Sequence, residues 1–197
     1  MKSGLGQYFT TNPELQEACV TFCRNASRGR GAILEPSAGQ GDLVRAMHCA
    51  YSSCPTHAVE IDADLPPVHV RPGRDKWLCA DFLTCEPPQK TYRTIVGNPP
   101  YVRRGPTNLY LLFVEKCVGL LSKGGELVFV LPADFFKLTS AAELLTQMCN
   151  QGAFTDIYRP HSEKLFAGAS IDVMVVRYEK TPSLPPVCRD HTTREEM

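Results

Sequence analysis

The sequence predicts an α/β fold with a Rossmann-like, doubly wound and mostly parallel sheet of seven strands. Three observations favour this class. Short apolar segments alternate with amphipathic segments along most of the chain. The short segments are apolar on both faces, as in strands that helices cover on both sides. The last two of them follow each other without a helix between, which predicts an antiparallel hairpin at one edge of the sheet.

The first half of the chain begins with a helix over 11–24. Thr11 is its expected N-cap, because Glu14 follows three residues later and completes a capping box. A buried strand over 31–35 ("GAILE") then runs into a glycine-containing turn and a helix over 42–51. Further strands are expected over 57–62, 77–82 and 92–97.

The second half opens with the clearest helical pattern of the sequence, over 108–122. The segment "KGGELVFVLP" (123–132) ends this helix with glycines at 124 and 125 and then continues as a strongly apolar strand. A helix over 140–150 and strands over 154–160 and 171–180 complete one domain, residues 1–180. From 181 to 197 the chain is polar and proline-containing, which predicts a flexible C-terminal tail.

Composition narrows the function classes. The chain has 197 residues, 43% of them hydrophobic, which is enough for one domain with a full core. Lys+Arg and Asp+Glu both number 21, so the net charge is near zero, whereas proteins that bind duplex phosphates are usually basic. We therefore expect any nucleic-acid contact to be confined to a local surface or to be made from outside this chain. The nine cysteines form no C-x-x-C pair and no signal peptide is recognisable, which favours free thiols, no metal and an intracellular protein that is not secreted.

Three strand ends carry residues suited to a nucleoside. Gly39 and Gly41 lie in the turn "PSAGQGD", where backbone can approach a ligand closely. Glu60 ends the second strand about twenty residues later, where a carboxylate can accept both ribose hydroxyls. Asp81 and Phe82 end the third strand and place an acceptor beside an aromatic ring, which suits adenine. Each feature alone fits a tight turn or a solvated strand end; together they predict an adenosine ligand without pyrophosphate.

The fourth strand ends in "GNPPY", which is more than a turn requires. Asn98 and the carbonyl of Pro99 can present two fixed oxygens to the hydrogens of an –NH₂ group. Tyr101 adds a flat face on which a planar substrate can stack. The alternative is a proline-rich turn capped by asparagine.

The segments "GQYFTTNPE", "ILEPSAGQGD", "VEID", "ADF" and "GNPPY" occur in this order. In this arrangement the chain resembles the S-adenosylmethionine-dependent adenine-N6 DNA methyltransferases of restriction–modification systems, over roughly residues 4–180. "GNPPY" alone also occurs in glutamine and RNA methyltransferases; "GQYFT" together with "EPSAG" favours the DNA adenine class. The resemblance implies the class I methyltransferase fold and S-adenosylmethionine as the cofactor.

The resemblance also implies roles for individual residues. Thr11, together with the Gln7–Thr10 segment, would help to hold the methionine carboxylate of the cofactor. The methionine moiety would be contacted by Glu35, Pro36, Ser37 and Gly39, the ribose by Glu60, and the adenine by Asp81 and Phe82. Pro100 completes the expected cofactor-binding residues. The catalytic pocket would be formed by Asn98, Pro99, Pro100 and Tyr101.

The implied substrate is a DNA adenine that is flipped out of the duplex and takes the methyl group by direct in-line displacement. The base would stack between Tyr101 and Phe166, while Arg103 and Arg104 hold phosphates. For Phe166 a place in the core is an equal alternative, and for the arginines a role as plain surface charges. No histidine, metal or cysteine nucleophile is expected to take part.

Recognition of DNA sequence is the point where the chain departs from the family. Relatives of this class carry a further recognition domain, and no separate domain of this kind is expected within the 197 residues. The departure favours a separate specificity subunit, low specificity or another substrate. The alternatives are methylation of RNA adenine or of a protein glutamine amide, or a non-catalytic methyltransferase-fold subunit of a larger complex.

Overall fold

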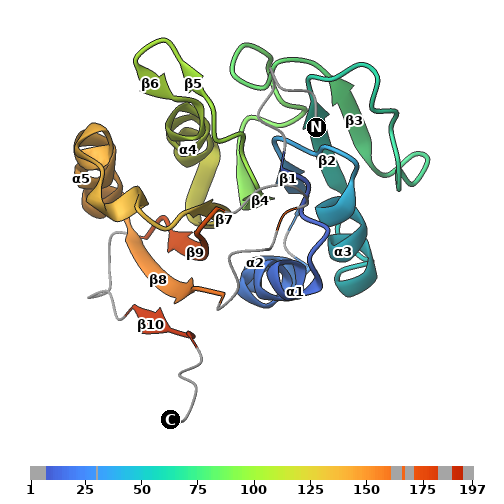
Figure 1. Ribbon diagram of the computed structural model, residues 1–197. Helices are drawn as coiled ribbons and strands as arrows, with labels where there is room; N and C mark the ends of the chain where they lie inside the picture. Colours follow the sequence, from blue (N-terminus) through green and yellow to red (C-terminus); the bar gives the residue numbers. More distant parts are fainter. Residues whose placement is uncertain (1–7, 30, 161–165, 167–170, 182–187, 193–197) are drawn as a thin grey trace.

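The computed structural model describes residues 8–29, 31–160, 166, 171–181 and 188–192. Within these ranges the main sheet has eight strands in the order β10-β8-β9-β7-β4-β1-β2-β3 (Figure 1). The strands are β1 (Ile33–Glu35), β2 (Thr56–Glu60), β3 (Lys76–Cys79), β4 (Tyr92–Gly97), β7 (Leu121–Pro132), β8 (Ala153–Tyr158), β9 (Val173–Glu179) and β10 (Arg189–Asp190).

The pairing confirms the predicted fold class. Strands β3, β2, β1, β4 and β7 run parallel to one another, whereas β9 is antiparallel to both β7 and β8. The number of strands differs from the seven expected. The eighth, β10, lies in the segment expected as a tail and pairs parallel to β8, where the backbone N–H of His191 donates to the carbonyl of Ile157 at 2.8 Å.

Helices cover both faces of the sheet. Leu15 and Met47, from two helices of one layer, pack in one buried cluster with Val128 of the sheet. Val114 of the opposite layer packs in another cluster with Leu127. The described helices are α1 (Pro13–Phe22), α2 (Arg24–Ser27), α3 (Asp42–Ala50), α4 (Leu109–Leu120) and α5 (Ala142–Gln151), with 3-10 turns at Phe135–Lys137 and Thr139–Ala141. None of these helices is long and apolar enough to cross a membrane.

The cap of α1 differs from the expected one. The side chain of Asn12 accepts hydrogen bonds from the backbone N–H groups of Glu14 and Leu15, at 2.9 and 3.2 Å. Because the helix begins at Pro13, its N-cap is Asn12 and not Thr11, which is exposed. The capping box at Thr11 was therefore wrong by one residue.

A small hairpin follows the "GNPPY" segment. Strands β5 (Arg103–Arg104) and β6 (Thr107–Asn108) pair antiparallel, and Gly105 turns the chain with a φ of 62°. The sequence analysis did not predict this hairpin, because two-residue strands leave no periodic pattern. It places both arginines at the edge of the site described below.

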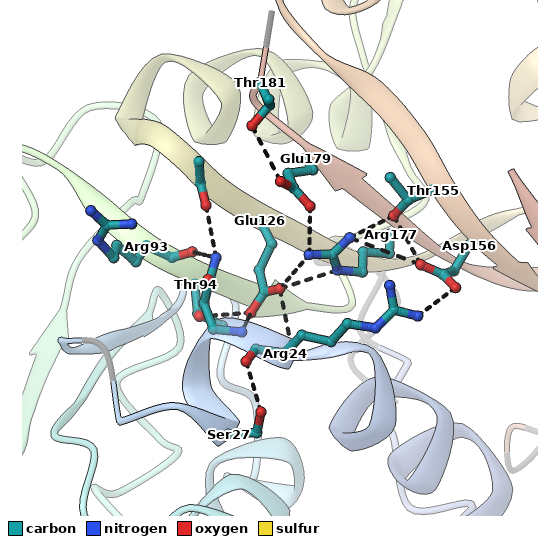
Figure 2. Close-up of polar contacts among 12 residues, drawn as sticks. Arg24, Ser27, Arg93, Thr94, Glu126, Thr155, Asp156, Arg177, Glu179 and Thr181 are labelled. Carbon is teal, nitrogen blue, oxygen red and sulfur yellow. Dashed lines mark hydrogen bonds and ion pairs between the residues drawn. The ribbon is translucent and has the colours of Figure 1, made fainter. Parts of the chain in front are cut away.

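A buried carboxylate ties the first helices to the sheet (Figure 2). Glu126 of β7 is fully buried and accepts from the backbone N–H groups of Arg24 and Asn25, at 3.1 and 2.6 Å, and from the hydroxyl of Thr94, at 2.9 Å. Arg177 of β9 donates to it from Nε and Nη2, at 3.1 and 2.9 Å. The carboxylate is thus paired with a charge and satisfied by neutral donors, as a buried ion requires.

Candidate cofactor and catalytic site

A cavity of about 270 Å³ lies at the carboxyl ends of β1 to β4. Parallel strands that share this edge bring together the residues that follow them in sequence, which is where open α/β sheets bind ligands. The cavity lining includes many of the residues that sequence analysis assigned: Pro36, Ser37, Gly39, Glu60, Asp81, Phe82, Asn98, Pro100, Arg103 and Arg104.

Other assigned residues do not line this cavity. Thr11 is exposed, whereas Pro99 is buried, and neither lines the cavity. Tyr101 and Phe166 pack with the cluster beneath α1 instead. Gln7 lies outside the described residues.

The turn after β1 fixes the carboxylate of Glu60 at the cavity wall. The backbone N–H of Gly39 donates to its Oε2 at 2.6 Å, and that of Asp62 donates to its Oε1 at 2.8 Å. Gly39 has a φ of 56°, and a Cβ there would lie 2.9 Å from the ring of Phe9. Glycine is therefore required by both backbone conformation and space, and the carboxylate is held by main-chain donors.

Residues that follow β3 also line the cavity. Asp81 accepts from the backbone N–H of Leu83 at 2.9 Å, and Arg104 of the hairpin lies 3.5 Å from its other oxygen. Phe82 is buried, with its ring 5.2 Å from that of Phe113, so it forms a wall of the cavity. Ile61 is a lining residue that sequence analysis missed; its position directly after Glu60 is the signal that could have found it.

Two unpaired carboxylate oxygens border a second, smaller cavity. Glu35 Oε2 and Asp42 Oδ2 are buried and lack a hydrogen-bond partner among the described residues. Both residues line a space of about 20 Å³ that shares Ser37 and Gly39 with the larger cavity. Buried carboxyl oxygens without a hydrogen-bond partner can accept from an N–H group that enters the cavity, such as the ammonium of a methionine moiety. Sequence analysis assigned Glu35 to that moiety but missed Asp42.

Burial raises the pKa of Glu35 from its ordinary value of 4.5 to about 8, although Ser37 donates to Oε1 from its backbone N–H, at 3.1 Å, and from its hydroxyl. In the native state the Glu35 carboxyl group therefore keeps its proton up to about pH 8, whereas in the unfolded chain it loses this proton near pH 4.5. Because the native state binds more protons in this window, its stability falls as pH rises through it.

Glu35→Gln should remove this pH dependence. Between pH 5.5 and 8 we expect the free energy of unfolding of the unmodified protein to fall by about 3 kcal/mol relative to that of the variant. Urea unfolding of both proteins at four pH values measures the difference. Parallel pH profiles would show that Glu35 titrates normally in the folded protein.

The side-chain amide of Asn98 is held from both ends. Its Nδ2 donates to the carbonyl of Tyr8 at 2.8 Å and to Oγ1 of Thr10 at 3.0 Å. Its Oδ1 accepts from the hydroxyl of Tyr101 at 2.5 Å, and that hydroxyl also lies 3.0 Å from the carbonyl of Val130. The donor side of the amide is thus saturated, whereas Oδ1 keeps a second lone pair for another donor.

Three aromatic rings meet beside this amide. The ring of Tyr8 stacks on that of Tyr101, with centroids 5.5 Å apart and planes inclined by 26°. It also contacts the ring of Phe166 at 5.5 Å. The two rings expected to enclose a base therefore each contact Tyr8 instead. Sequence analysis included Tyr8 only as part of the Gln7–Thr10 segment and gave it no role of its own. The aromatic residue in "GQYFT" was the signal that could have indicated its contacts with the other two rings.

The strand order and the cavity at its carboxyl edge define the class I S-adenosylmethionine-dependent methyltransferase fold. A putative methyltransferase of this class from Listeria monocytogenes has a TM-score of 0.71 at 16% identity, covering 91% of this chain and 65% of that one. A type I restriction–modification methyltransferase subunit from Streptococcus thermophilus has a TM-score of 0.75 at 14% identity, covering 89% and 45%.

Sequence comparison identifies the group more closely. Residues 74–166 match the Eco57I restriction-modification methylase family. The chain is 31% identical over 183 residues to the type II methyltransferase M.TthHB8I of Thermus thermophilus, with 76% of this chain and 40% of that protein covered. It is 27% identical over 203 residues to M.HincII of Haemophilus influenzae, with 91% and 38% covered.

The chain is therefore related to the restriction–modification methyltransferases, which confirms the resemblance carried by its motifs. Fold and family together imply S-adenosylmethionine as the cofactor. The chain spans about two fifths of the length of these curated relatives.

Proposed function

We propose that the chain is the catalytic part of a DNA methyltransferase that modifies the exocyclic N6 amine of adenine. The observation that carries the proposal is the Asn98 amide, whose oxygen keeps an acceptor position free at the edge of a nucleoside-sized cavity. The relationship to restriction–modification methyltransferases favours DNA as the substrate. The aromatic rings beside Asn98 favour a planar base over a glutamine amide.

The cofactor would be held by residues at the ends of β1 to β3. Glu60 would accept from the ribose hydroxyls and Asp81 from the adenine amine, while Glu35 and Asp42 would receive the ammonium group in the smaller cavity. The apolar side chains of Ile61 and Phe82 would pack against the adenine ring. When bound, S-adenosylmethionine supplies an electrophilic methyl group.

The chain's own contribution is to position the amine of the substrate. Asn98 Oδ1 and the Pro99 carbonyl would accept its two hydrogens and direct its lone pair toward the methyl group, and transfer would follow by in-line displacement. Tyr101 would stack on the base, which requires the ring of Tyr8 to leave its present contact. Phe166 would then face the base from the other side.

Recognition of DNA beyond the target base would involve the hairpin. Arg103 and Arg104 lie at the rim of the cavity and are exposed, so phosphates can reach them. Sequence specificity would come from a recognition region or subunit that acts together with this chain.

Radiolabelled S-adenosylmethionine tests the proposal when it is supplied with duplex DNA, single-stranded DNA, RNA or a protein extract in separate reactions. We expect label on DNA only. Label on RNA or protein instead would overturn the proposed substrate. Binding of the cofactor without transfer to any acceptor, even at high DNA concentration, would favour a non-catalytic subunit.

A further inference from the structure

An asparagine amide can be placed in two ways that differ by exchange of its oxygen and nitrogen. Only one of them presents an oxygen to an incoming amine. For Asn98 the choice depends on the groups that surround it, because both ends of the amide occupy the same volume.

The segment before α1 decides the orientation. The carbonyl of Tyr8 can only accept, so the atom of Asn98 that faces it at 2.8 Å must be the donor Nδ2. The reversed amide would bring two oxygens together at this distance. Thr10 Oγ1 accepts the second hydrogen of Nδ2 at 3.0 Å, and this side chain is only 5% exposed, so water offers no equivalent acceptor.

Thr10 is itself fixed from the opposite side. Its carbonyl accepts from the side chain of Gln16, in α1, at 2.7 Å. Phe9, its neighbour in sequence, packs over Gly39 at the wall of the cofactor cavity. The hydroxyl that meets Asn98 is therefore anchored between the first helix and the cofactor-binding turn.

We propose that Thr10 is a positioning residue for methyl transfer: with the Tyr8 carbonyl, its hydroxyl fixes the Asn98 amide so that Oδ1 faces the substrate amine. The inference rests on the proposed function of Asn98 as acceptor of that amine. In this role Thr10 acts through Asn98. Thr10 also lines the smaller cavity beside Glu35 and Asp42, so kinetics must separate the two roles. Loss of positioning lowers kcat, whereas a rise in KM for S-adenosylmethionine without a fall in kcat would show a cofactor contact instead and would overturn the proposal.

Thr10→Val tests the proposal, since valine keeps the shape of threonine and removes the acceptor. We expect kcat to fall about tenfold, as for one lost orienting hydrogen bond, with KM for S-adenosylmethionine changed less than twofold. Thr10→Ser keeps the hydroxyl and should retain at least a third of the activity. Thr146→Val, at an exposed position of α5, is the matched control and should leave kcat unchanged.

A spectroscopic readout separates positioning from a merely structural role. In ¹⁵N-labelled protein the side-chain amide of Asn98 is assigned by its absence from Asn98→Ala. We expect Thr10→Val to shift one of its two Nδ2 proton resonances upfield, and Thr10→Ser to keep it near its original position. Thermal unfolding checks that each variant is folded, and Thr10→Ala replaces Thr10→Val if the latter is not.

Equal kcat for Thr10→Val and the unmodified protein, or equal losses in Thr10→Val and Thr10→Ser, would overturn the proposal. So would unchanged Asn98 amide resonances in Thr10→Val. If the unmodified protein transfers no methyl group to any acceptor, the proposed function fails. The amide resonances then still show whether Thr10 holds Asn98.

Discussion

Asn98→Ala should lower methyl transfer by at least about 10²–10³-fold while the protein still folds and binds its cofactor. The substitution removes the oxygen that would accept the substrate amine, and it leaves the other residues that line the two cavities unchanged. A loss of this size is typical when one preorganised hydrogen-bonding group is removed from the site of charge development. Single-turnover label transfer at saturating cofactor measures the effect.

Asn150→Ala is the control for this experiment, because Asn150 is exposed on α5, far in the sequence from every strand end of the site. It should transfer methyl groups at the unmodified rate. Calorimetric titration with S-adenosylmethionine shows whether cofactor binding survives in Asn98→Ala. Transfer by Asn98→Ala within tenfold of the unmodified rate would mean that another group accepts the amine.

Arg177→Ala should destabilise the fold by about 3–5 kcal/mol. Its guanidinium donates twice to Glu126 and lies 3.9 Å from Asp156, and the side chains of both carboxylates are completely buried. Without Arg177 the carboxylates of Glu126 and Asp156 remain buried but lose the positive charge of the guanidinium that stabilises them. Urea unfolding followed by circular dichroism measures the change in the free energy of unfolding.

Arg45→Ala provides the comparison for a surface charge. Arg45 is half exposed and lies 4.0 Å from Asp42, so its removal should change stability by less than about 0.5 kcal/mol. If Arg177→Ala were equally mild, the network around Glu126 would not be a determinant of stability.

The sequence was sufficient to predict the edge of the sheet at which the site lies. Glu60, Asp81 and Asn98 each follow an apolar strand, and in a parallel sheet the carboxyl ends of neighbouring strands meet at one edge. The structure brings all three to one cavity for this reason. Local patterns of apolar residues were enough here, because strand direction follows from the alternation of strands and helices.

Contacts between distant segments could not be read from such patterns. Tyr8 and Tyr101 lie far apart in the sequence, and no local pattern indicates that their rings stack. Asp42 lies in the first turn of α3, where acidic residues are common because they interact favourably with the helix dipole. The sequence therefore gave no reason to expect its unpaired oxygen at the cavity that it shares with Glu35. Strand β10 has two residues and depends on pairing with β8.

The amine that we propose to be methylated is N6 of adenine in DNA. The most direct measurement is mass spectrometry of nucleosides released from DNA that has been incubated with the chain and isotopically labelled S-adenosylmethionine. We predict labelled N6-methyladenine, and none in the same reaction with Asn98→Ala. Label in N4-methylcytosine or C5-methylcytosine, with none in N6-methyladenine, would contradict the account.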